Sequence, residues 1–209
     1  MQRLGILGGT FDPVHFGHLR PAVEVRAALA LDRVLLIPCR VSPHRTDPHA
    51  SGAARRDMLA AAVAGEPDLV VDDRELERDG PSYTIDTLHQ IAGEAPDAVL
   101  HLIIGADAAA AFDRWHRWEE ILEYVHLVVT QRPGWPLHLP AGLEDRRVAA
   151  ADDLERHRAG SVWVQQVTQL DISATAVRAL AAAGGDLRYL VPEAVRALIL
   201  EQSLYTTGE

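Results

Sequence analysis

The chain has 209 residues, of which 48% are hydrophobic and 24% are charged, and this length can bury one full hydrophobic core without a second globular domain. The formal net charge of −10 argues against a protein that mainly binds duplex nucleic acid, because that binding depends on clustered positive charge. No stretch approaches ~18 uninterrupted apolar residues, so we expect a cytoplasmic protein without a membrane partner.

Strand-like and helix-like segments alternate along the chain from its first residues. Over the first half, the apolar pattern predicts strands at residues 4–8, 34–38 and 69–72 and helices at 17–31, 55–64 and 84–92. The clearest continuous apolar strand is residues 99–104, followed by helical stretches around 106–112 and 118–124 and a strand at 126–130. The charged segment from 132 to about 160 is expected to be a solvated, loop-rich connection with little function.

The C-terminal quarter continues the alternation with a strand at residues 162–167. A helix begins within 172–178 with Ser173 as its N-cap, and a final helix starts at Pro192 and runs to about Glu201. This order predicts an α/β fold with a Rossmann-like, doubly wound, mainly parallel sheet and helices on both faces. We expect a single domain over 1–209, with a small C-terminal helical part at about 173–209 packed on it. Ligands of such sheets bind at the carboxyl ends of strands, near a switch in strand order.

The most informative segment is GGTFDPVHFGH at residues 8–18, which directly follows the first predicted strand. Gly8 and Gly9 are expected to let the backbone approach an anion and adopt positive φ at a sharp turn. His15 and His18 are three residues apart where a helix begins, so they can share one face and point at the same phosphate oxygens. Taken alone, such a pair also fits helix-capping or packing histidines, or a metal pair.

The basic residues narrow the ways in which this chain can bind phosphate. All twenty are arginine and none is lysine, so a Walker-type loop, which needs Gly-Lys-Ser/Thr, is excluded. Phosphate must therefore be bound by backbone N–H groups, arginine guanidinium groups and histidines. Cys39 is the only cysteine, which excludes an intrachain disulfide and a cysteine-based zinc site and leaves it as an ordinary strand-end side chain.

A second candidate phosphate site lies at the predicted start of the helix near residue 173. Ser173 and Thr175 would sit where unpaired N–H groups and the helix dipole attract phosphate, and Arg178 is one turn further along. A plain N-cap followed by a surface arginine is the alternative for this motif taken alone.

Together these motifs carry a family resemblance that extends from Leu4 to about Tyr205. The His-x-x-His segment and ISATAVR at 172–178 resemble the signatures of a nucleotidyltransferase superfamily. Within it, the chain resembles the nicotinate-nucleotide adenylyltransferase family through GPSYT at 80–84 with DTL at 86–88, IGAD at 104–107 with Trp115 downstream, and RPG at 132–134.

The resemblance implies a reaction in which the 5′-phosphate of nicotinate mononucleotide attacks the α-phosphorus of ATP, with Mg²⁺ held by the ATP phosphates rather than by a protein metal site. It implies catalytic roles for His15, His18 and Arg178. The ATP-binding residues it implies are Gly8, Gly9, Thr10, Phe11, Gly105, Asp107, Ile172, Ser173 and Thr175. The candidates for binding the mononucleotide are Arg40, His44, Arg45, Tyr83, Thr84, Trp115 and Arg132. Asp107 could otherwise only cap the next helix, and Trp115 could only fill the core.

The chain departs from the family pattern after the second strand, where Pro38 to Arg45 reads PCRVSPHR. Arg45 stands where the family often has lysine, and a bidentate fork is not a point charge. Arg40 could lie near the mononucleotide or turn to solvent, and the loop at 42–51 could order only when substrate binds. One alternative is a sister enzyme acting on nicotinamide mononucleotide or phosphopantetheine, although Tyr83, Thr84 and Trp115 argue against phosphopantetheine. Another is a non-catalytic nucleotide- or metal-binding protein, which predicts disrupted histidine or Ser-x-Thr-x-x-Arg motifs, and both motifs are intact. A homo-oligomeric state also remains open.

Overall fold

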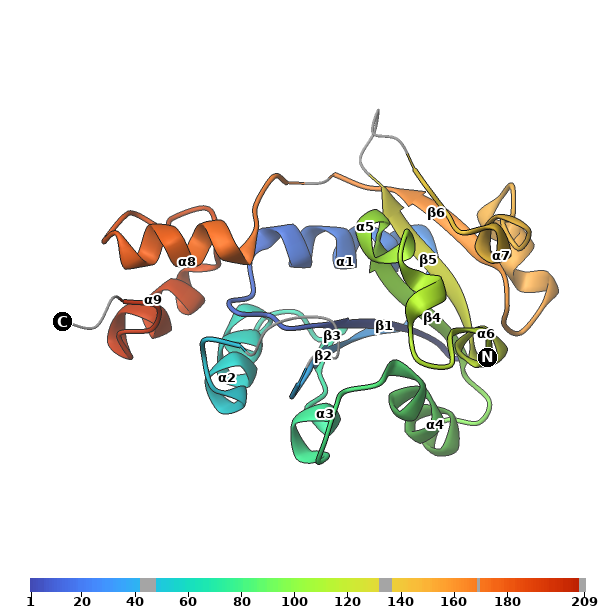
Figure 1. The fold of residues 1–209 in the computed structure, drawn as a ribbon, viewed down its shortest axis with the longest axis horizontal. Coiled ribbons are helices and arrows are strands. Elements are labelled where there is room, and N and C mark those ends of the chain that lie inside the picture. The colour runs from blue at the N-terminus through green and yellow to red at the C-terminus, as the bar shows by residue number, and fades with distance from the viewer. Residues whose placement is uncertain (42–47, 132–136, 169, 207–209) are drawn as a thin grey trace.

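The computed structural model describes residues 1–41, 48–131, 137–168 and 170–206 and contains one six-stranded sheet. The strands lie in the order β3-β2-β1-β4-β5-β6, and every neighbouring pair is parallel (Figure 1). Their bounds are β1 Arg3–Gly9, β2 Arg33–Pro38, β3 Leu69–Val71, β4 Val99–Gly105, β5 Val125–Gln131 and β6 Val162–Gln166. The predicted doubly wound α/β fold is confirmed.

Helices follow nearly every strand. The longer ones are α1 Phe16–Ala28, α2 Gly52–Ala62, α4 Thr84–Glu94, α6 Trp118–Tyr124, α8 Ala174–Ala182 and α9 Glu193–Glu201. The shorter ones are α3 Arg74–Glu77, α5 Ala106–Ala109 and α7 Ala141–Glu144, with 3₁₀ turns η1 Phe112–Arg114 and η2 Ala151–Arg156. Within the described ranges, no helix has the length and apolar character needed to cross a membrane.

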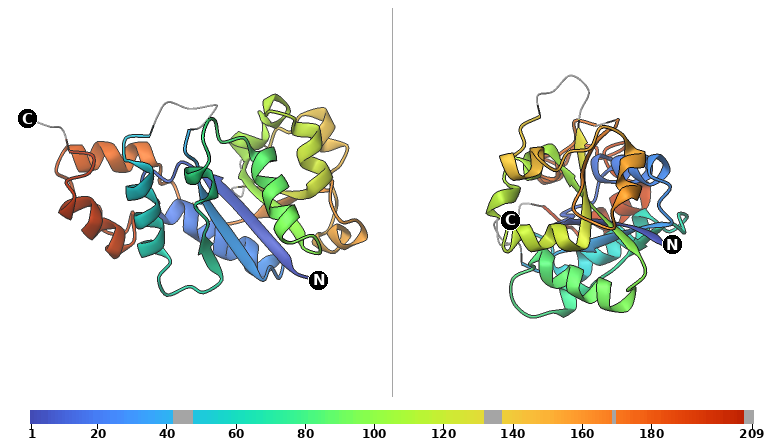
Figure 2. Two further views of the ribbon diagram at one scale, coloured as in Figure 1. Left: turned by 90° about the horizontal axis from the view of Figure 1, so that it is seen from below. Right: turned by 90° about the vertical axis from the view of Figure 1, so that its right-hand side faces the viewer.

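Two hydrophobic clusters cover the two faces of the sheet. Neighbouring strand residues contribute to opposite clusters, as Leu102 and Ile103 of β4 do, because successive side chains on a strand point to opposite faces. One cluster includes apolar residues of α1, α2, α8 and α9, and the other includes those of α4 and α6. The helix α9 packs against α2, and the C-terminal helices lie beside α2 at the end of the molecule away from the N-terminus (Figure 2).

Several predicted boundaries were wrong, each for a local reason. The helix α2 begins at Gly52, because the Ser51 Oγ accepts a hydrogen bond from the Ala54 N–H at 3.2 Å. The last helix begins at Glu193, and Pro192 is its N-cap. The four-residue helix α3 was missed because one turn carries no periodic apolar pattern.

The segment expected to be a loop after residue 132 contains regular structure in its described part. Both α7 and η2 lie there. The Val148 N–H donates to the Val162 carbonyl at 2.9 Å, and the Val162 N–H donates to the Arg146 carbonyl at 2.9 Å. This part of the segment therefore lies against β6 and is not merely a solvated connection.

Candidate active site

The site lies where the strand order reverses. Strands β1 and β4 are neighbours, yet the chain leaves β1 toward β2 on one side and arrives at β4 from the far edge of the sheet. The histidine turn follows β1, which ends at Gly9, and the Gly105–Asp107 segment follows the carboxyl end of β4. Both predicted ligand-binding segments therefore meet at the switch point of the sheet, where such folds bind ligands.

The turn after β1 differs from the prediction in its backbone. Among the described residues, neither Gly8 nor Gly9 has a positive φ; the left-handed residue is Phe11, with φ of 49°. A Cβ on Gly9 would lie 3.3 Å from the Phe11 ring, whereas one on Gly8 would meet nothing within 4 Å. Gly9 therefore makes room for the buried Phe11 side chain, and the open side of Gly8 leaves the backbone accessible. Phe11 itself is 2% exposed and part of the core, so only its backbone can face a ligand.

The two histidines form a stacked pair at the start of α1. Their ring centroids are 3.7 Å apart, and the His15 N–H donates to the His18 Nδ1 at 3.3 Å. Because Nδ1 of His18 accepts, this nitrogen carries no hydrogen; the ring hydrogen is on Nε2, which makes Nε2 a donor. Burial lowers the pKa of His15 to about 4, and its buried Nδ1 has no partner among the described residues. The pair therefore consists of two oriented imidazoles, of which one has an unsatisfied buried nitrogen.

Gly17 allows this pair to lie close to the second motif. A Cβ at this position would be 2.9 Å from both Cε1 and Nδ1 of His15 and 3.0 Å from the Ile172 carbonyl oxygen. No side chain fits there without displacing a buried ring or a backbone carbonyl. The sequence prediction did not assign Gly17 a role, although its place between the two histidines was a signal for one.

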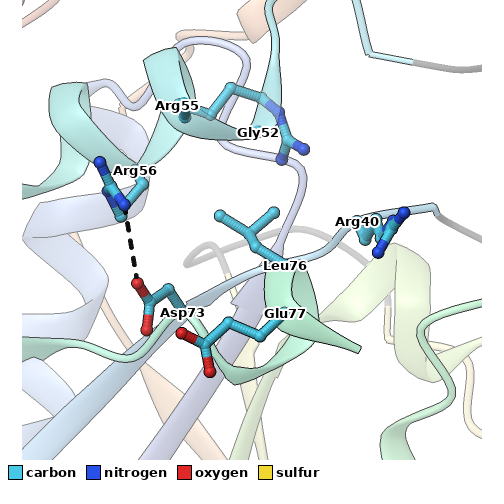
Figure 3. A pocket seen from close by; sticks show the side chains of 8 residues that line it. Arg40, Gly52, Arg55, Arg56, Asp73, Leu76 and Glu77 are labelled. Atoms are coloured by element: carbon cyan, nitrogen blue, oxygen red, sulfur yellow. Dashed lines mark ion pairs between the residues drawn. The ribbon is translucent and has the colours of Figure 1, made fainter. Parts of the chain in front are cut away.

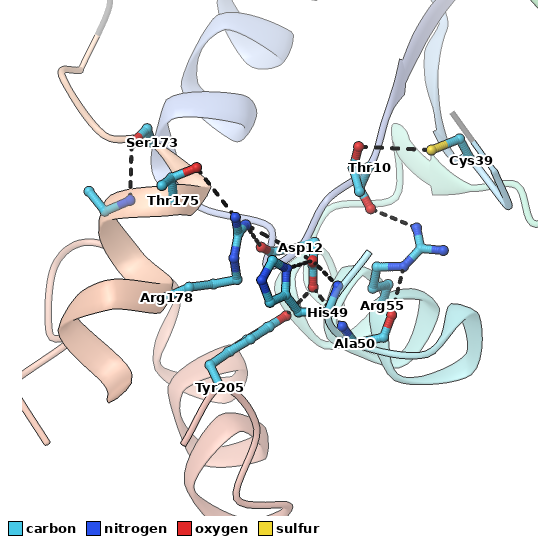
Figure 4. A network of polar contacts seen from close by, with 11 residues as sticks. Thr10, Asp12, Cys39, His49, Ala50, Arg55, Ser173, Thr175, Arg178 and Tyr205 are labelled. Carbon is cyan, nitrogen blue, oxygen red and sulfur yellow. Dashed lines mark hydrogen bonds and ion pairs between the residues drawn. The ribbon is translucent and has the colours of Figure 1, made fainter. Parts of the chain in front are cut away.

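The start of α8 is bound directly to the turn after β1 (Figure 4). Arg178 donates through Nη1 to the Asp12 carbonyl at 2.7 Å and through Nη2 to the Thr175 Oγ1 at 3.3 Å. Ser173 is the N-cap of α8, as predicted, and its Oγ accepts from the Ala176 N–H at 3.1 Å. The alternative for this motif is a plain N-cap followed by a surface arginine. Ser173 is indeed an N-cap, but Arg178 is not a surface arginine, since its side chain is only 20% exposed.

The segment after β4 presents Gly105 and Asp107 at its surface. Gly105 is the N-cap of the short helix α5, and Asp107 lies exposed in the first turn. Because Gly105 occupies the N-cap position and Asp107 is the second residue of the helix, Asp107 is not the N-cap of α5. Thr130 on the neighbouring strand β5 donates its hydroxyl to the Ile104 carbonyl at 3.2 Å, which fixes the end of β4.

The predicted pyridine-binding residues come together from two segments. Tyr83 is the N-cap of α4, and its ring centroid lies 4.3 Å from that of His116. Trp115 directly precedes His116 and is partly buried, with its ring 5.1 Å from that of Phe112. Thr84 is the first residue of α4. The start of α4 therefore lies beside the segment that carries Trp115.

Arg40 faces a different hollow (Figure 3). It lines a cavity of about 380 Å³ between α2 and α3, together with Gly52, Arg55, Arg56, Leu76 and Glu77. Its guanidinium pairs with Asp79 at 2.8 Å and donates to the Arg78 carbonyl at 3.3 Å. Neither histidine of the turn lines this cavity. The other predicted basic candidates, His44, Arg45 and Arg132, lie outside the described residues.

Two further observations concern possible metal or thiol chemistry. The part of the chain that the structure describes contains no group of three His, Cys, Asp or Glu side chains placed to hold a metal ion. Cys39 is buried, its Sγ lies 3.9 Å from the Thr10 Oγ1, and burial raises the pKa of the thiol. A buried thiol with a raised pKa is chemically inert, as expected for an ordinary strand-end side chain.

The comparisons with known proteins place this doubly wound sheet in the cytidylyltransferase-like class of nucleotidyltransferases. Residues 6–180 match the family model described as Cytidylyltransferase-like. Proteins named probable nicotinate-nucleotide adenylyltransferase are 47% identical in Aeromonas hydrophila, covering 97% of this chain and 96% of the relative, and 47% identical in Halorhodospira halophila, covering 98% and 96%. The chain belongs to the nicotinate-nucleotide adenylyltransferase family.

The fold agrees with a solved structure of much lower sequence identity. A Plasmodium falciparum nicotinic acid mononucleotide adenylyltransferase complexed with NaAD superposes with a TM-score of 0.75 at 14% identity, covering 98% of each chain. At that identity the likeness shows the fold.

Proposed function

We propose that this chain transfers the adenylyl group of ATP to the 5′-phosphate of nicotinate mononucleotide. A phosphate oxygen of the mononucleotide forms the new bond to the α-phosphorus, the bond between that phosphorus and the bridging oxygen to the β-phosphate breaks, and pyrophosphate leaves. The products are nicotinate adenine dinucleotide and pyrophosphate. The observation that carries the proposal is the junction of the two motifs, in which Arg178 binds the Asp12 carbonyl at 2.7 Å beside the stacked histidines.

The chemistry needs no protein nucleophile, because the acceptor phosphate supplies the attacking oxygen. The chain's task is to position two anions and stabilise the charge that develops on the transferred phosphoryl group. His18 is suited to this, since its Nε2–H is oriented as a donor by the bond that its Nδ1 accepts. Losing one such donor is expected to lower turnover about 10²-fold or more.

The start of α8 is proposed to receive the β- and γ-phosphates. Its first N–H groups and the helix dipole favour an anion, and Thr175 and Arg178 are already held together there. Gly105 and Asp107 are proposed to face the adenosine half, from the other side of the switch point.

The donors at this site suit phosphate oxygens rather than a resident metal. They are imidazole and backbone N–H groups, hydroxyls and a guanidinium, whereas Mg²⁺ prefers oxygen ligands and is commonly held by substrate phosphates. We propose that Mg²⁺ arrives on the triphosphate, where it neutralises negative charge.

The acceptor is proposed to bind between the start of α4 and Trp115. Backbone N–H groups at Thr84 can receive the nicotinate carboxylate, and the Trp115 ring offers a stacking face. A neutral amide gains less from a helix N-terminus, which favours the acid over the amide. His44, Arg45 and Arg132 remain candidates for phosphate contacts. Since both proposed substrates are intracellular nucleotides, the proposal places the enzyme in the cytoplasm.

The test measures pyrophosphate release from ATP and Mg²⁺ with nicotinate mononucleotide, nicotinamide mononucleotide or phosphopantetheine as acceptor. Release should be fastest with nicotinate mononucleotide. His18→Ala should abolish it while the circular dichroism spectrum is retained. The matched control is His157→Ala, at an exposed histidine that follows η2, which should behave as the parent. If no acceptor gives pyrophosphate release, the proposed enzymatic activity is refuted. If nicotinamide mononucleotide is preferred, the proposal that nicotinate mononucleotide is the acceptor is refuted.

A further inference from the structure

Asp12 joins four segments of the chain that are distant in sequence (Figure 4). Its carboxylate is 2% exposed and accepts from the His49 N–H at 2.7 Å on Oδ2 and from the Ala50 N–H at 3.1 Å on Oδ1. Tyr205, near the C-terminus, donates its hydroxyl to Oδ1 at 2.7 Å. The backbone carbonyl of Asp12 accepts from Arg178.

Arg178 could contact Asp12 through the backbone carbonyl or through the carboxylate, and the distances distinguish the two. Its Nη1 lies 2.7 Å from the carbonyl oxygen of Asp12 but 4.0 Å from the carboxylate Oδ2. The guanidinium is therefore bonded to the backbone and only adjacent to the charge. A direct fork onto the carboxylate would be the stronger, charge-assisted contact. Other contacts must therefore hold the Asp12 carboxylate away from the Arg178 guanidinium.

The three hydrogen bonds recorded on the carboxylate do this: two come from the backbone N–H groups of His49 and Ala50, and one comes from the Tyr205 hydroxyl. The Nδ1 of the His49 side chain also lies 3.5 Å from Oδ2. Burial, together with the neighbouring Asp12, raises the pKa of Tyr205 well above its usual range, so its hydroxyl keeps the proton that it donates. Tyr205 has a left-handed backbone, with φ of 63°, and packs against the cluster that contains α8 and α9. The packing of Tyr205 in the C-terminal turn thus holds its hydroxyl against the Asp12 carboxylate.

We propose that Tyr205 is a positioning residue that keeps the Asp12 carboxylate from capturing Arg178, and so keeps the guanidinium available to the ATP phosphates. The C-terminal turn is then part of the ATP-binding machinery, although it does not touch the substrate. Without the hydroxyl, the Ala50 N–H is the one donor to Oδ1 that remains among the described residues, while Oδ2 keeps the His49 N–H. The carboxylate can then rotate about that bond toward Nη1, which is already within 4.0 Å of Oδ2. The inference rests on the proposed function for the role of Arg178.

The test uses Tyr205→Phe, which removes the hydroxyl and keeps the packed ring. Calorimetry with α,β-methylene-ATP and Mg²⁺, without acceptor, should show about tenfold weaker binding. In turnover, the KM for ATP should rise by a similar factor while the KM for nicotinate mononucleotide stays within twofold. A loss of folded protein alone would lower the maximal rate and leave both KM values unchanged. Tyr124→Phe on α6 is the matched control and should match the parent.

A double variant tests the route through Arg178. In an Arg178→Ala background, Tyr205→Phe should weaken binding of the analogue by less than twofold, because the group it positions is gone. Tenfold weakening in both backgrounds would overturn the inference, as would parent-like binding by Tyr205→Phe. If the parent binds the analogue but releases no pyrophosphate, the proposed function fails and the affinities alone decide the inference. A parent that does not bind the analogue overturns both.

Discussion

Replacing Gly17 by alanine should disable the site while leaving the fold in place. The added Cβ would lie 2.9 Å from the His15 ring and 3.0 Å from the Ile172 carbonyl, and real Cβ atoms essentially never approach closer than 3.0 Å. Neither neighbour can yield easily. His15 is 4% exposed and stacked on His18, and the carbonyl belongs to the backbone that leads into α8.

The expected magnitudes follow from these contacts. Overpacking of this kind costs ~1–3 kcal/mol, and the better helix propensity of alanine returns at most ~1 kcal/mol, so the net loss of stability should be ~0–3 kcal/mol. Activity should suffer more, because a shift of about 1 Å in a catalytic group can cost about 10²-fold. We therefore expect kcat to fall about 10²-fold in a protein that remains folded at 25 °C.

The assay combines pyrophosphate release with urea denaturation, and Gly93→Ala is the matched control. Gly93 is also helical and exposed, and a Cβ there would meet nothing within 4 Å. The control should keep full activity and gain up to ~1 kcal/mol of stability. If Gly17→Ala retains kcat within threefold of the parent, the close approach of the two motifs does not position the histidines and the reasoning is wrong.

Two further predictions concern stability. Burial lowers the pKa of His15 and of His101 from 6.5 to about 4, so the unfolded chain binds protons before the folded chain does as the pH falls. The free energy of unfolding should therefore drop between about pH 6.5 and 4, by up to ~3 kcal/mol for each histidine. Urea midpoints that stay constant from pH 7 to 5 would contradict this. Gly142→Ala would place a Cβ 2.7 Å from the Trp118 ring, so it should lower the thermal midpoint with kcat unchanged; a midpoint equal to that of the parent would show that the ring moves aside without cost.

The sequence predicts the fold and the two ends of the site because their signals are local. Each strand of the sheet is a short apolar run, and each motif follows directly after a strand or at a helix start. The single-turn helices α3 and α7 escape such reasoning, since one turn is too short to show a period. The left-handed turn was assigned to the glycines, where residue preference points, but tertiary packing places it at Phe11.

The contacts that unite the site leave no local signal at all. Asp12 and Tyr205 are 193 residues apart, and Asp12 and Arg178 are 166 apart. No spacing rule relates positions so distant, and the family resemblance reaches Tyr205 without giving it a role. Their roles emerge only when the fold brings α8 and the C-terminal turn against the turn that follows β1.

Arginine suits position 178 because, in the proposed function, this side chain both links α8 to the turn after β1 and binds phosphate. A guanidinium has five N–H donors in a fixed plane, and the two recorded bonds, to the Asp12 carbonyl and the Thr175 hydroxyl, use two of them. The side chain can therefore tie two segments together and still direct N–H groups at phosphate. An ammonium has three donors and no fixed fork, so anchoring it at two points would leave a single donor for the substrate. In the proposed function, the same residue thus links α8 to the turn after β1 and supplies part of the positive charge that binds the phosphates, in a chain whose formal net charge is −10.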